Sequence, residues 1–293
     1  MLPPFEKYVG RMPGWVKHFF LATYIERLTF KITSRCDEFV YIDGFSGPWK
    51  SDADDFEDTS FGIALLALRQ AKATWKRIRN RDVRMTALLV EKSPAAYARL
   101  DTVKAKFPDI DIRTFKGDFV ELIPALIAAI PANAFTFILI DPKGYAIDMK
   151  AVAPLLARPR TEAVFNFMFD FINRASDHPD PLVTAHLDRL MPDSGWRERL
   201  AATVREGETA TRPARRKREL VDAFSDTLRR IGAYPYVLET PVYFPLADRT
   251  FYSLIYATRS AIGLEVFRDC QVATLLEQES RRGQGCSVLL IEA

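Results

Sequence analysis

The stretch FVYIDGFSGP, residues 39–48, decides how the rest of the chain is interpreted. An apolar run rich in aromatic and β-branched residues ends in an acid and two nearby glycines, which is typical of a buried strand that runs into a tight loop. Glycine has no Cβ, so the backbone of such a loop can approach a ligand closely. Asp43, at the strand tip, can accept hydrogen bonds from an amine or a ribose hydroxyl. A Gly-x-x-Gly loop alone is more often structural, so its meaning depends on the residues further along the chain.

The composition indicates a globular chain that can form a large core. Of the 293 residues, 48% are hydrophobic, which suits one large α/β domain; the net charge is only +3, so any surface for a nucleic acid must be local. The three cysteines (Cys36, Cys270, Cys286) have no metal-ligand spacing, and their odd number argues against a disulfide framework. Residues 1–10 lack the apolar segment of a signal peptide, and no apolar run reaches the roughly 20 residues of a membrane span. We therefore expect a cytoplasmic protein without a metal site or membrane partner.

Strands and helices alternate at least five times along the first 170 residues. Apolar runs predict strands at 39–43, 85–91, 111–115, 135–140 and 163–167, and helices at 15–28, 63–68, 94–103, 122–130 and 148–156. Thr59 or Ser60 can cap the second of these helices, and Ser93 is expected to cap the third. This order predicts a doubly wound, Rossmann-like, mostly parallel sheet covered on both faces. Further along, we expect an antiparallel edge pair at 234–244 and 251–258, then a helix at 264–279. The whole chain, 1–293, is predicted to be one domain with a covering helix at 15–30 and a helical insertion at 176–230.

Acids lie at or just beyond the carboxyl ends of four predicted strands: Asp43, Glu91, Asp118 and Asp141. In open parallel sheets, ligands bind at this edge. Asp43 with Gly44 and Gly47 suits the amino-acid part of a nucleoside cofactor; Glu91 suits ribose hydroxyls, and Asp118 an adenine amino group. These roles fit S-adenosylmethionine better than a dinucleotide, because the loop lacks the Gly-x-Gly-x-x-Gly spacing. Phe45 and Phe119 complete the predicted cofactor set. The alternative is that Glu91 and Asp118 are solvated strand ends or helix caps.

The sequence Asp141-Pro142-Lys143-Gly144-Tyr145 resembles the Asp/Asn-Pro-Pro-Tyr/Phe motif of methyltransferases that modify exocyclic amino groups. In that motif the acid and a backbone carbonyl accept hydrogen bonds from the target nitrogen, and the aromatic ring stacks on a flipped base. We therefore predict catalytic roles for Asp141, Pro142 and Tyr145 and a substrate contact for Lys143. Here Lys143 replaces the second proline and Gly144 displaces the aromatic residue by one position. An ordinary Asp-Pro turn is the structural alternative.

Short motifs occur in order along the chain: Lys17-His18, residues 41–48 (YIDGFSGP), Gly117-Asp118-Phe119, Ile140-Asp141-Pro142-x-Gly144-Tyr145 and residues 166–174 (NFMFDFINR). Together they resemble the three-Cys-motif partner protein (TcmP) family of bacteria and phages. The resemblance covers most of the chain, and residues 166–174 are its most specific part. It implies a class I methyltransferase-like fold, S-adenosylmethionine as the cofactor and a genetically linked three-cysteine protein as a partner. It does not establish the methyl acceptor.

Residues that follow the fifth predicted strand are candidates for substrate contacts. Amide and guanidinium groups suit base edges or phosphates, which points to Asn166, Asp170, Asn173 and Arg174. The alternative is that the two asparagines cap backbone groups. His18, His178 and His186 form no recognisable metal or nucleophile pattern.

A basic cluster opens the last helix of the predicted insertion: Arg212, Arg215, Arg216, Lys217 and Arg218. Arginine can hold a phosphate with paired donors, so we predict phosphate contacts for Arg212, Arg215 and Arg216; a solvated helix face is the alternative. The sequence thus favours S-adenosylmethionine-dependent methyl transfer to a nucleic acid. Two rivals stay open: a non-catalytic cofactor-binding partner or defence-system subunit, and a nucleic-acid-binding protein with a decayed fold.

Overall fold

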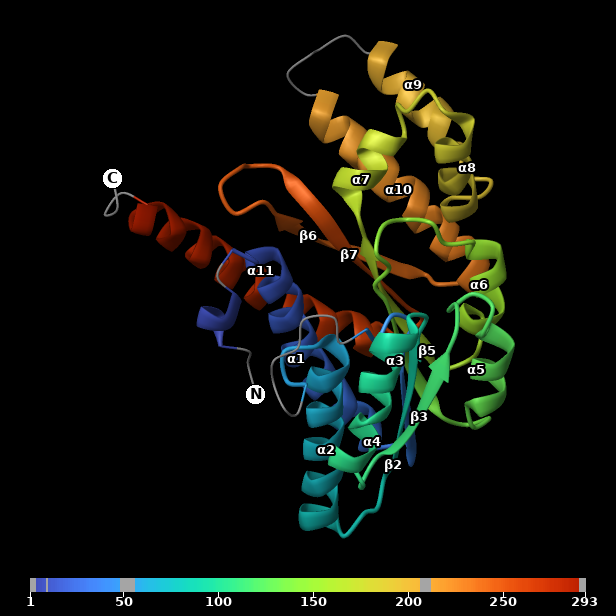
Figure 1. The fold of residues 1–293 in the computed structure, drawn as a ribbon, viewed down its shortest axis with the longest axis vertical. Helices are drawn as coiled ribbons and strands as arrows, with labels where there is room; N and C mark the ends of the chain where they lie inside the picture. Colours follow the sequence, from blue (N-terminus) through green and yellow to red (C-terminus); the bar gives the residue numbers. More distant parts are fainter. Residues whose placement is uncertain (1–3, 9, 48–55, 206–211, 290–293) are drawn as a thin grey trace.

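A seven-stranded sheet forms the centre of the protein (Figure 1). The computed structural model describes residues 4–8, 10–47, 56–205 and 212–289. The strand order is β3-β2-β1-β4-β5-β7-β6; β1 to β5 are parallel, and β7 is antiparallel to both β5 and β6. The strands are β1 (Glu38–Asp43), β2 (Arg84–Glu91), β3 (Asp111–Lys116), β4 (Phe135–Ile140), β5 (Thr161–Phe167), β6 (Tyr236–Tyr243) and β7 (Thr250–Thr258). The predicted fold class, a doubly wound and mostly parallel sheet with an antiparallel edge pair, is confirmed.

The central strands are apolar on both sides because helices cover both faces of the sheet. In β1, Phe39 and Tyr41 belong to one hydrophobic core, whereas Val40 and Ile42 belong to the other. All four side chains have no exposed surface. This explains why the first strand is a continuous apolar run in the sequence.

One face of the sheet is covered by helices from both ends of the chain. They are α1 (Met12–Thr33), α2 (Ser60–Arg79), α3 (Pro94–Asp101), α4 (Val103–Lys106) and α11 (Ala261–Leu289). Figure 1 shows α1 lying between α2 and α11. Thr59 caps α2, since its side chain accepts a hydrogen bond from the Gly62 N–H at 3.0 Å. A short 3₁₀ helix, η1 (Phe5–Tyr8), precedes α1.

The opposite face carries the remaining helices, α5 (Ile123–Ala129), α6 (Met149–Leu156), α7 (Phe169–Ala175), α8 (Pro181–Leu190), α9 (Trp196–Arg205) and α10 (Arg212–Gly232). Asp148 caps α6 by accepting hydrogen bonds from the N–H groups of Lys150 and Ala151. Helices α7 to α10 gather at the end of the sheet where β5 finishes (Figure 1). The three helices α8, α9 and α10 occupy the segment for which a helical insertion was predicted.

Two local predictions need correction. Ser93 makes no side-chain cap at the start of α3; its backbone N–H instead donates to Glu91 Oε1 at 2.5 Å. The last helix, α11, begins at Ala261 and extends to Leu289, well beyond the predicted 264–279. Its buried positions, such as Phe267 and Cys270, pack against the first core. Across the described residues, no helix is long and apolar enough to span a membrane.

Candidate ligand-binding site

A cavity of about 750 Å³ opens at the carboxyl ends of the parallel strands, within the size range of small-molecule sites. It lies where β1 and β4 adjoin, which is the point where the strand order reverses and where α/β sheets bind ligands. The cavity brings together sequence positions from three predicted groups: Asp43, Gly44, Phe45, Gly47, Glu91, Asp118, Phe119, Asp141, Pro142, Lys143 and Asn166.

Asp43 is a buried carboxyl group at the floor of this cavity, with only 1% of its surface exposed. Its Oδ1 accepts the Phe45 N–H at 2.9 Å, and its Oδ2 accepts the Tyr41 hydroxyl at 3.1 Å. Burial, with the nearby Asp141 carboxyl, raises the pKa of Asp43 to about 6 in spite of these two donors. A buried carboxyl with a raised pKa is stabilised when a cationic ligand group binds beside it.

Residue 44 must be a glycine because an aromatic ring of the protein, and not a ligand, packs closely against its backbone. A Cβ at this position would lie 2.8 Å from Phe119 Cδ2, so any side chain here would displace that ring. Phe119 is buried, and Phe45 packs against it with ring centroids 5.6 Å apart. The loop after β1 and the loop after β3 therefore form one aromatic wall of the cavity.

Glu91 is the last residue of β2, and Asp118 follows β3. Glu91 is 5% exposed, and the Ser93 N–H holds its Oε1. Asp118 Oδ1 accepts the Val120 N–H at 3.0 Å, and its Oδ2 pairs with the exposed Lys92 at 3.0 Å. Each acid thus has backbone support and also lines the cavity.

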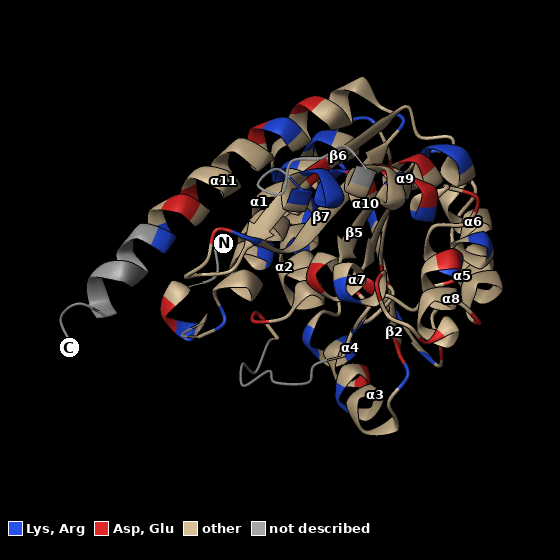
Figure 2. Ribbon diagram, turned by 90° about the horizontal axis from the view of Figure 1, so that it is seen from above, with Lys and Arg blue, Asp and Glu red and all other residues tan. Residues whose placement is uncertain are grey.

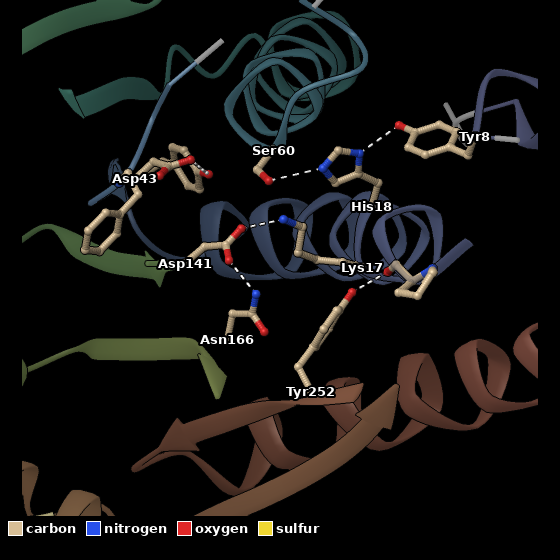
Figure 3. Close-up of polar contacts among 11 residues, drawn as sticks. Tyr8, Lys17, His18, Asp43, Ser60, Asp141, Asn166 and Tyr252 are labelled. Atoms are coloured by element: carbon tan, nitrogen blue, oxygen red, sulfur yellow. Dashed lines mark hydrogen bonds and ion pairs between the residues drawn. The ribbon is translucent and has the colours of Figure 1, made fainter. Parts of the chain in front are cut away.

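Asp141, at the end of β4, forms the opposite wall together with two residues from distant parts of the chain (Figure 3). Lys17, on α1, forms an ion pair with Asp141 Oδ2, and Asn166, at the end of β5, donates from Nδ2 to Asp141 Oδ1 at 2.5 Å. The side chains of Lys17 and Asp141 are 16% and 18% exposed. Both carboxylate oxygens therefore already have partners within the protein.

Asn166 carries an unused acceptor. The residue is 7% exposed, and within the described part of the chain its buried Oδ1 has no hydrogen-bond partner. Since Nδ2 donates to Asp141, the amide orientation is set and Oδ1 is the free end. A buried acceptor without a donor costs about 1–3 kcal/mol, which a ligand N–H or O–H can recover.

Tyr145 does not line this cavity. Its ring meets His186 of α8 edge to face, with centroids 6.4 Å apart, and it borders a much smaller second cavity. Gly144, at φ 109°, adds one residue between Pro142 and the ring and turns the chain away. In this conformation Tyr145 is therefore not placed to stack on a substrate in the main cavity, unlike Pro142 and the exposed Lys143.

Asp170, Asn173 and Arg174 also lie outside the cavity lining, on α7. Asp170 pairs with Arg174 at 2.9 Å and with Arg249 of the β6–β7 turn at 3.6 Å. Asn173 accepts a hydrogen bond from Arg216 Nε at 2.6 Å. These contacts fix α7 against the β6–β7 hairpin and α10.

The basic cluster is divided by its contacts. Arg216 donates to Asn173 and Ser176 and pairs with Asp177, and its side chain is only 12% exposed. Lys217 pairs with Glu239 at 2.8 Å. Arg212 and Arg218 are exposed, and Arg215 is half-buried with an interaction of its own. Figure 2 shows residues of both charge signs intermixed over α9 and α10. A phosphate-binding role fits Arg212 better than Arg216, whose donors serve the protein itself.

Residues in or directly before α1 and α2 also line the cavity and were not among the predicted site residues: Arg11, Lys17, His18 and Ser60. Lys17-His18 appeared only as part of the family resemblance. Apart from that resemblance, one signal in the sequence could have identified Lys17 and His18 as site residues: these two polar residues interrupt the apolar side of a predicted amphipathic helix. Among the described residues, no group of three or more His, Cys, Asp or Glu side chains is arranged to hold a metal ion.

No protein-family model matches the chain, and no curated protein sequence is significantly similar to it. Solved structures with a related arrangement include protein LPL1258 of Legionella pneumophila, described by the family model DUF519, with 12% identity, coverage of 87% of this chain and 90% of that one, and a TM-score of 0.47. A precorrin-6y C5,15-methyltransferase of Geobacter metallireducens has 13% identity, coverage of 80% and 87%, and a TM-score of 0.35. A loganic acid methyltransferase with SAH has 8% identity, coverage of 94% and 85%, and a TM-score of 0.34. None of these three reaches a TM-score of 0.5, so the function rests on the site itself.

Proposed function

We propose that this protein is an S-adenosylmethionine-dependent methyltransferase. The observation that carries the proposal is the cavity in which Asp43, Glu91 and Asp118 lie at or just beyond the ends of three neighbouring strands while Asp141 and Asn166 face them. Three acids on one side suit a ligand with several hydrogen-bond donors and a positive charge. A second wall with its own unused acceptor suits a second molecule.

The groups of S-adenosylmethionine match the first wall in order. Asp43 is buried and its pKa is raised to about 6, so its carboxylate would bind the ammonium group. Glu91 would accept hydrogen bonds from the ribose hydroxyls, and Asp118 from the adenine amino group. Phe119 and Phe45 provide an apolar wall beside them.

A dinucleotide fits this wall poorly. A pyrophosphate needs backbone N–H donors at a glycine-rich helix start, and three carboxylates nearby would repel it. The Phe119 ring fills the space beside Gly44, the glycine nearest the strand, so a phosphate cannot bind there.

The second wall supports methyl transfer to an acceptor that carries N–H or O–H donors, with a nucleic acid as the favoured class. When bound, S-adenosylmethionine would supply the methyl group, and the acceptor would release one N–H or O–H proton to solvent. Asp141 and Asn166 Oδ1 can accept hydrogen bonds from such an acceptor and orient its lone pair. An exocyclic amino group of a base has the required two donors, and the exposed Lys143 at the rim suits a phosphate.

A second candidate is a non-catalytic cofactor-binding subunit that acts with a partner, for which the three-Cys-motif resemblance suggests a genetically linked protein. Two observations favour it. Lys17 and Asn166 already occupy both oxygens of Asp141, and Tyr145 faces α8 rather than the cavity. A partner that draws Lys17 away from Asp141 would then be needed for activity.

Methyl transfer from labelled S-adenosylmethionine to separate pools of DNA, RNA and protein tests the proposal, with Asp141→Asn as the matched control. The proposal predicts label in a nucleic-acid pool with the wild type and none with the variant. Cofactor binding without label in any pool would favour the non-catalytic subunit. An absence of cofactor binding would contradict both.

A further inference from the structure

A chain of hydrogen bonds runs from the N-terminal segment to the cavity through a buried histidine (Figure 3). The Tyr8 hydroxyl lies 2.7 Å from His18 Nδ1, and His18 Nε2 lies 3.3 Å from Ser60 Oγ. Tyr8 and His18 are 4% and 8% exposed, whereas Ser60 is half-buried, and both His18 and Ser60 line the cavity. Three elements, η1, α1 and α2, are thus joined at one point of the cavity wall.

The protonation states of this chain determine what Ser60 can offer a ligand. Burial lowers the pKa of His18 well below its usual range, and the neighbouring Lys17 and Arg11 lower it further. Burial and Asp58 raise the pKa of Tyr8 to about 12, so the phenol keeps its proton. A neutral imidazole has one donor and one acceptor nitrogen. When the Tyr8 hydroxyl donates to Nδ1, Nε2–H donates to Ser60 Oγ, and the Ser60 hydroxyl proton is then directed away from His18.

This wall also carries charged groups and the start of a helix. Arg11 and Asp58 line it, and Lys17, which lines the cavity as well, is paired with Asp141. Ser60 is the first residue of α2, a helix of 20 residues, so the positive end of the helix dipole lies beside its hydroxyl. In the view of Figure 3, Ser60 lies between Asp43 and His18. A hydroxyl donor at a helix N-terminus therefore lines the same cavity as the acid proposed to hold an ammonium group.

We propose that Ser60, oriented by His18 and Tyr8, binds the carboxylate of the amino-acid part of the cofactor, while Asp43 binds its ammonium group. The inference rests on the proposed function and adds a residue that determines specificity. Binding of the carboxylate selects the arrangement in which the hydrogen bonds run from Tyr8 through His18 to Ser60, because an anion requires a donor. Tyr8 and His18 act through Ser60 and are positioning residues.

Calorimetric titration with S-adenosylmethionine and with its decarboxylated analogue tests the inference. The analogue keeps the ammonium, sulfonium and adenosine groups and lacks only the carboxylate. We expect the wild type to bind S-adenosylmethionine at least about tenfold more tightly, as a charge-assisted hydrogen bond implies. Ser60→Ala is expected to remove most of this preference by weakening S-adenosylmethionine alone. Tyr8→Phe should reduce the preference partly, because the imidazole loses the donor that orients it.

Ser34→Ala is the matched control, since Ser34 lies at the C-terminal end of α1 outside the cavity lining and its hydroxyl donates to the Lys31 carbonyl. It should leave the preference unchanged. A wild type that binds both ligands equally, or a Ser60→Ala variant that weakens both to the same extent, would overturn the inference and leave the proposed function intact. Failure of the wild type to bind either ligand would overturn the proposed function and the inference with it.

Discussion

The two walls of the cavity are built in different ways. On the cofactor wall each acid is held by the backbone N–H two residues further along: Asp43 by Phe45, Glu91 by Ser93 and Asp118 by Val120. On the acceptor wall, Asp141 is held by Lys17 and Asn166, which are 124 and 25 residues away in the sequence. The first wall is thus set by local turn geometry, and the second by the packing of α1 against the sheet.

This difference has a consequence for function. Carboxyl groups in local turns keep their orientation whenever the strand ends are formed, so the cofactor wall is preorganised. The orientation of Asp141 depends instead on where α1 lies, because Lys17 reaches it from that helix. The acceptor wall is therefore the part that a substrate or partner can alter.

The largest expected effect is on the rate of methyl transfer and tests whether the two walls act separately. Asp141→Asn should lower the rate of methyl transfer at least about 100-fold, because an amide replaces the carboxylate that orients the acceptor, while changing cofactor affinity less than about threefold. Single-turnover transfer and calorimetry on the same variant provide the measurements. Lys17→Gln is a useful companion, since it frees Asp141 without removing the acid. Loss of cofactor binding in Asp141→Asn would show that the walls are not separate.

On the cofactor wall, Glu91→Ala should weaken S-adenosylmethionine binding by about 1–3 kcal/mol, the usual cost of leaving ligand donors unpaired. The rate of transfer at saturating cofactor should change little. Titration calorimetry is the test, with Ser93→Ala as a control for the loop. Equal affinities for wild type and Glu91→Ala would remove Glu91 from the ligand site.

The fit of Gly44 against Phe119 predicts an effect on stability as well as binding. Gly44→Ala places a Cβ 2.8 Å from Phe119 Cδ2, and such overpacking typically costs about 1–3 kcal/mol. Denaturant unfolding should register the loss, and the double variant Gly44→Ala with Phe119→Leu should recover part of it. A Gly44→Ala protein as stable as the wild type would mean that the ring moves freely and that the aromatic wall is not fixed.

The last prediction distinguishes the members of the basic cluster, of which the exposed ones should have the smallest effect on stability. Arg216→Gln should lower the free energy of unfolding by about 1–3 kcal/mol, because its guanidinium joins α10 to α7 and the segment after it. Replacing the exposed Arg212 and Arg218 by glutamine should leave stability unchanged. If they contact duplex DNA, the slope of binding against salt should fall by about 0.9 for each lost contact. An unchanged slope assigns both residues to a solvated helix face.

Local signals were sufficient for the fold and for the grouping of the strand-tip acids. Continuous apolar strands, the Thr59 cap and the acids after β1 to β4 all depend on neighbouring residues. The acceptor wall was only partly predictable. Asp141 and Asn166 follow strands and were identified, but the contact of Lys17 with Asp141 depends on how α1 packs. The positive φ of Gly144 turned Tyr145 away, and the contacts of Arg216 with α7 and the segment after it distinguish this residue from the exposed Arg212 of the same basic run.

Asp43 permits the most direct test of the central claim that this wall binds a cationic nucleoside cofactor. Its pKa of about 6 lies above its ordinary value of 3.8, so the unliganded folded protein binds the extra proton and loses the corresponding stability as pH rises from about 4 to 6. A ligand ammonium reverses this preference, because it binds the ionised carboxylate. Affinity for S-adenosylmethionine should therefore rise with pH, by about tenfold between pH 5 and pH 7.

Isothermal titration of wild type and Asp43→Asn with S-adenosylmethionine at pH 5, 6 and 7 measures this directly. We expect one-to-one binding by the wild type that strengthens as Asp43 ionises, and weaker binding by Asp43→Asn that no longer depends on pH over this range. Wild-type binding that is absent, constant or weaker at pH 7 than at pH 5 would contradict the claim that Asp43 holds the ammonium group of the cofactor.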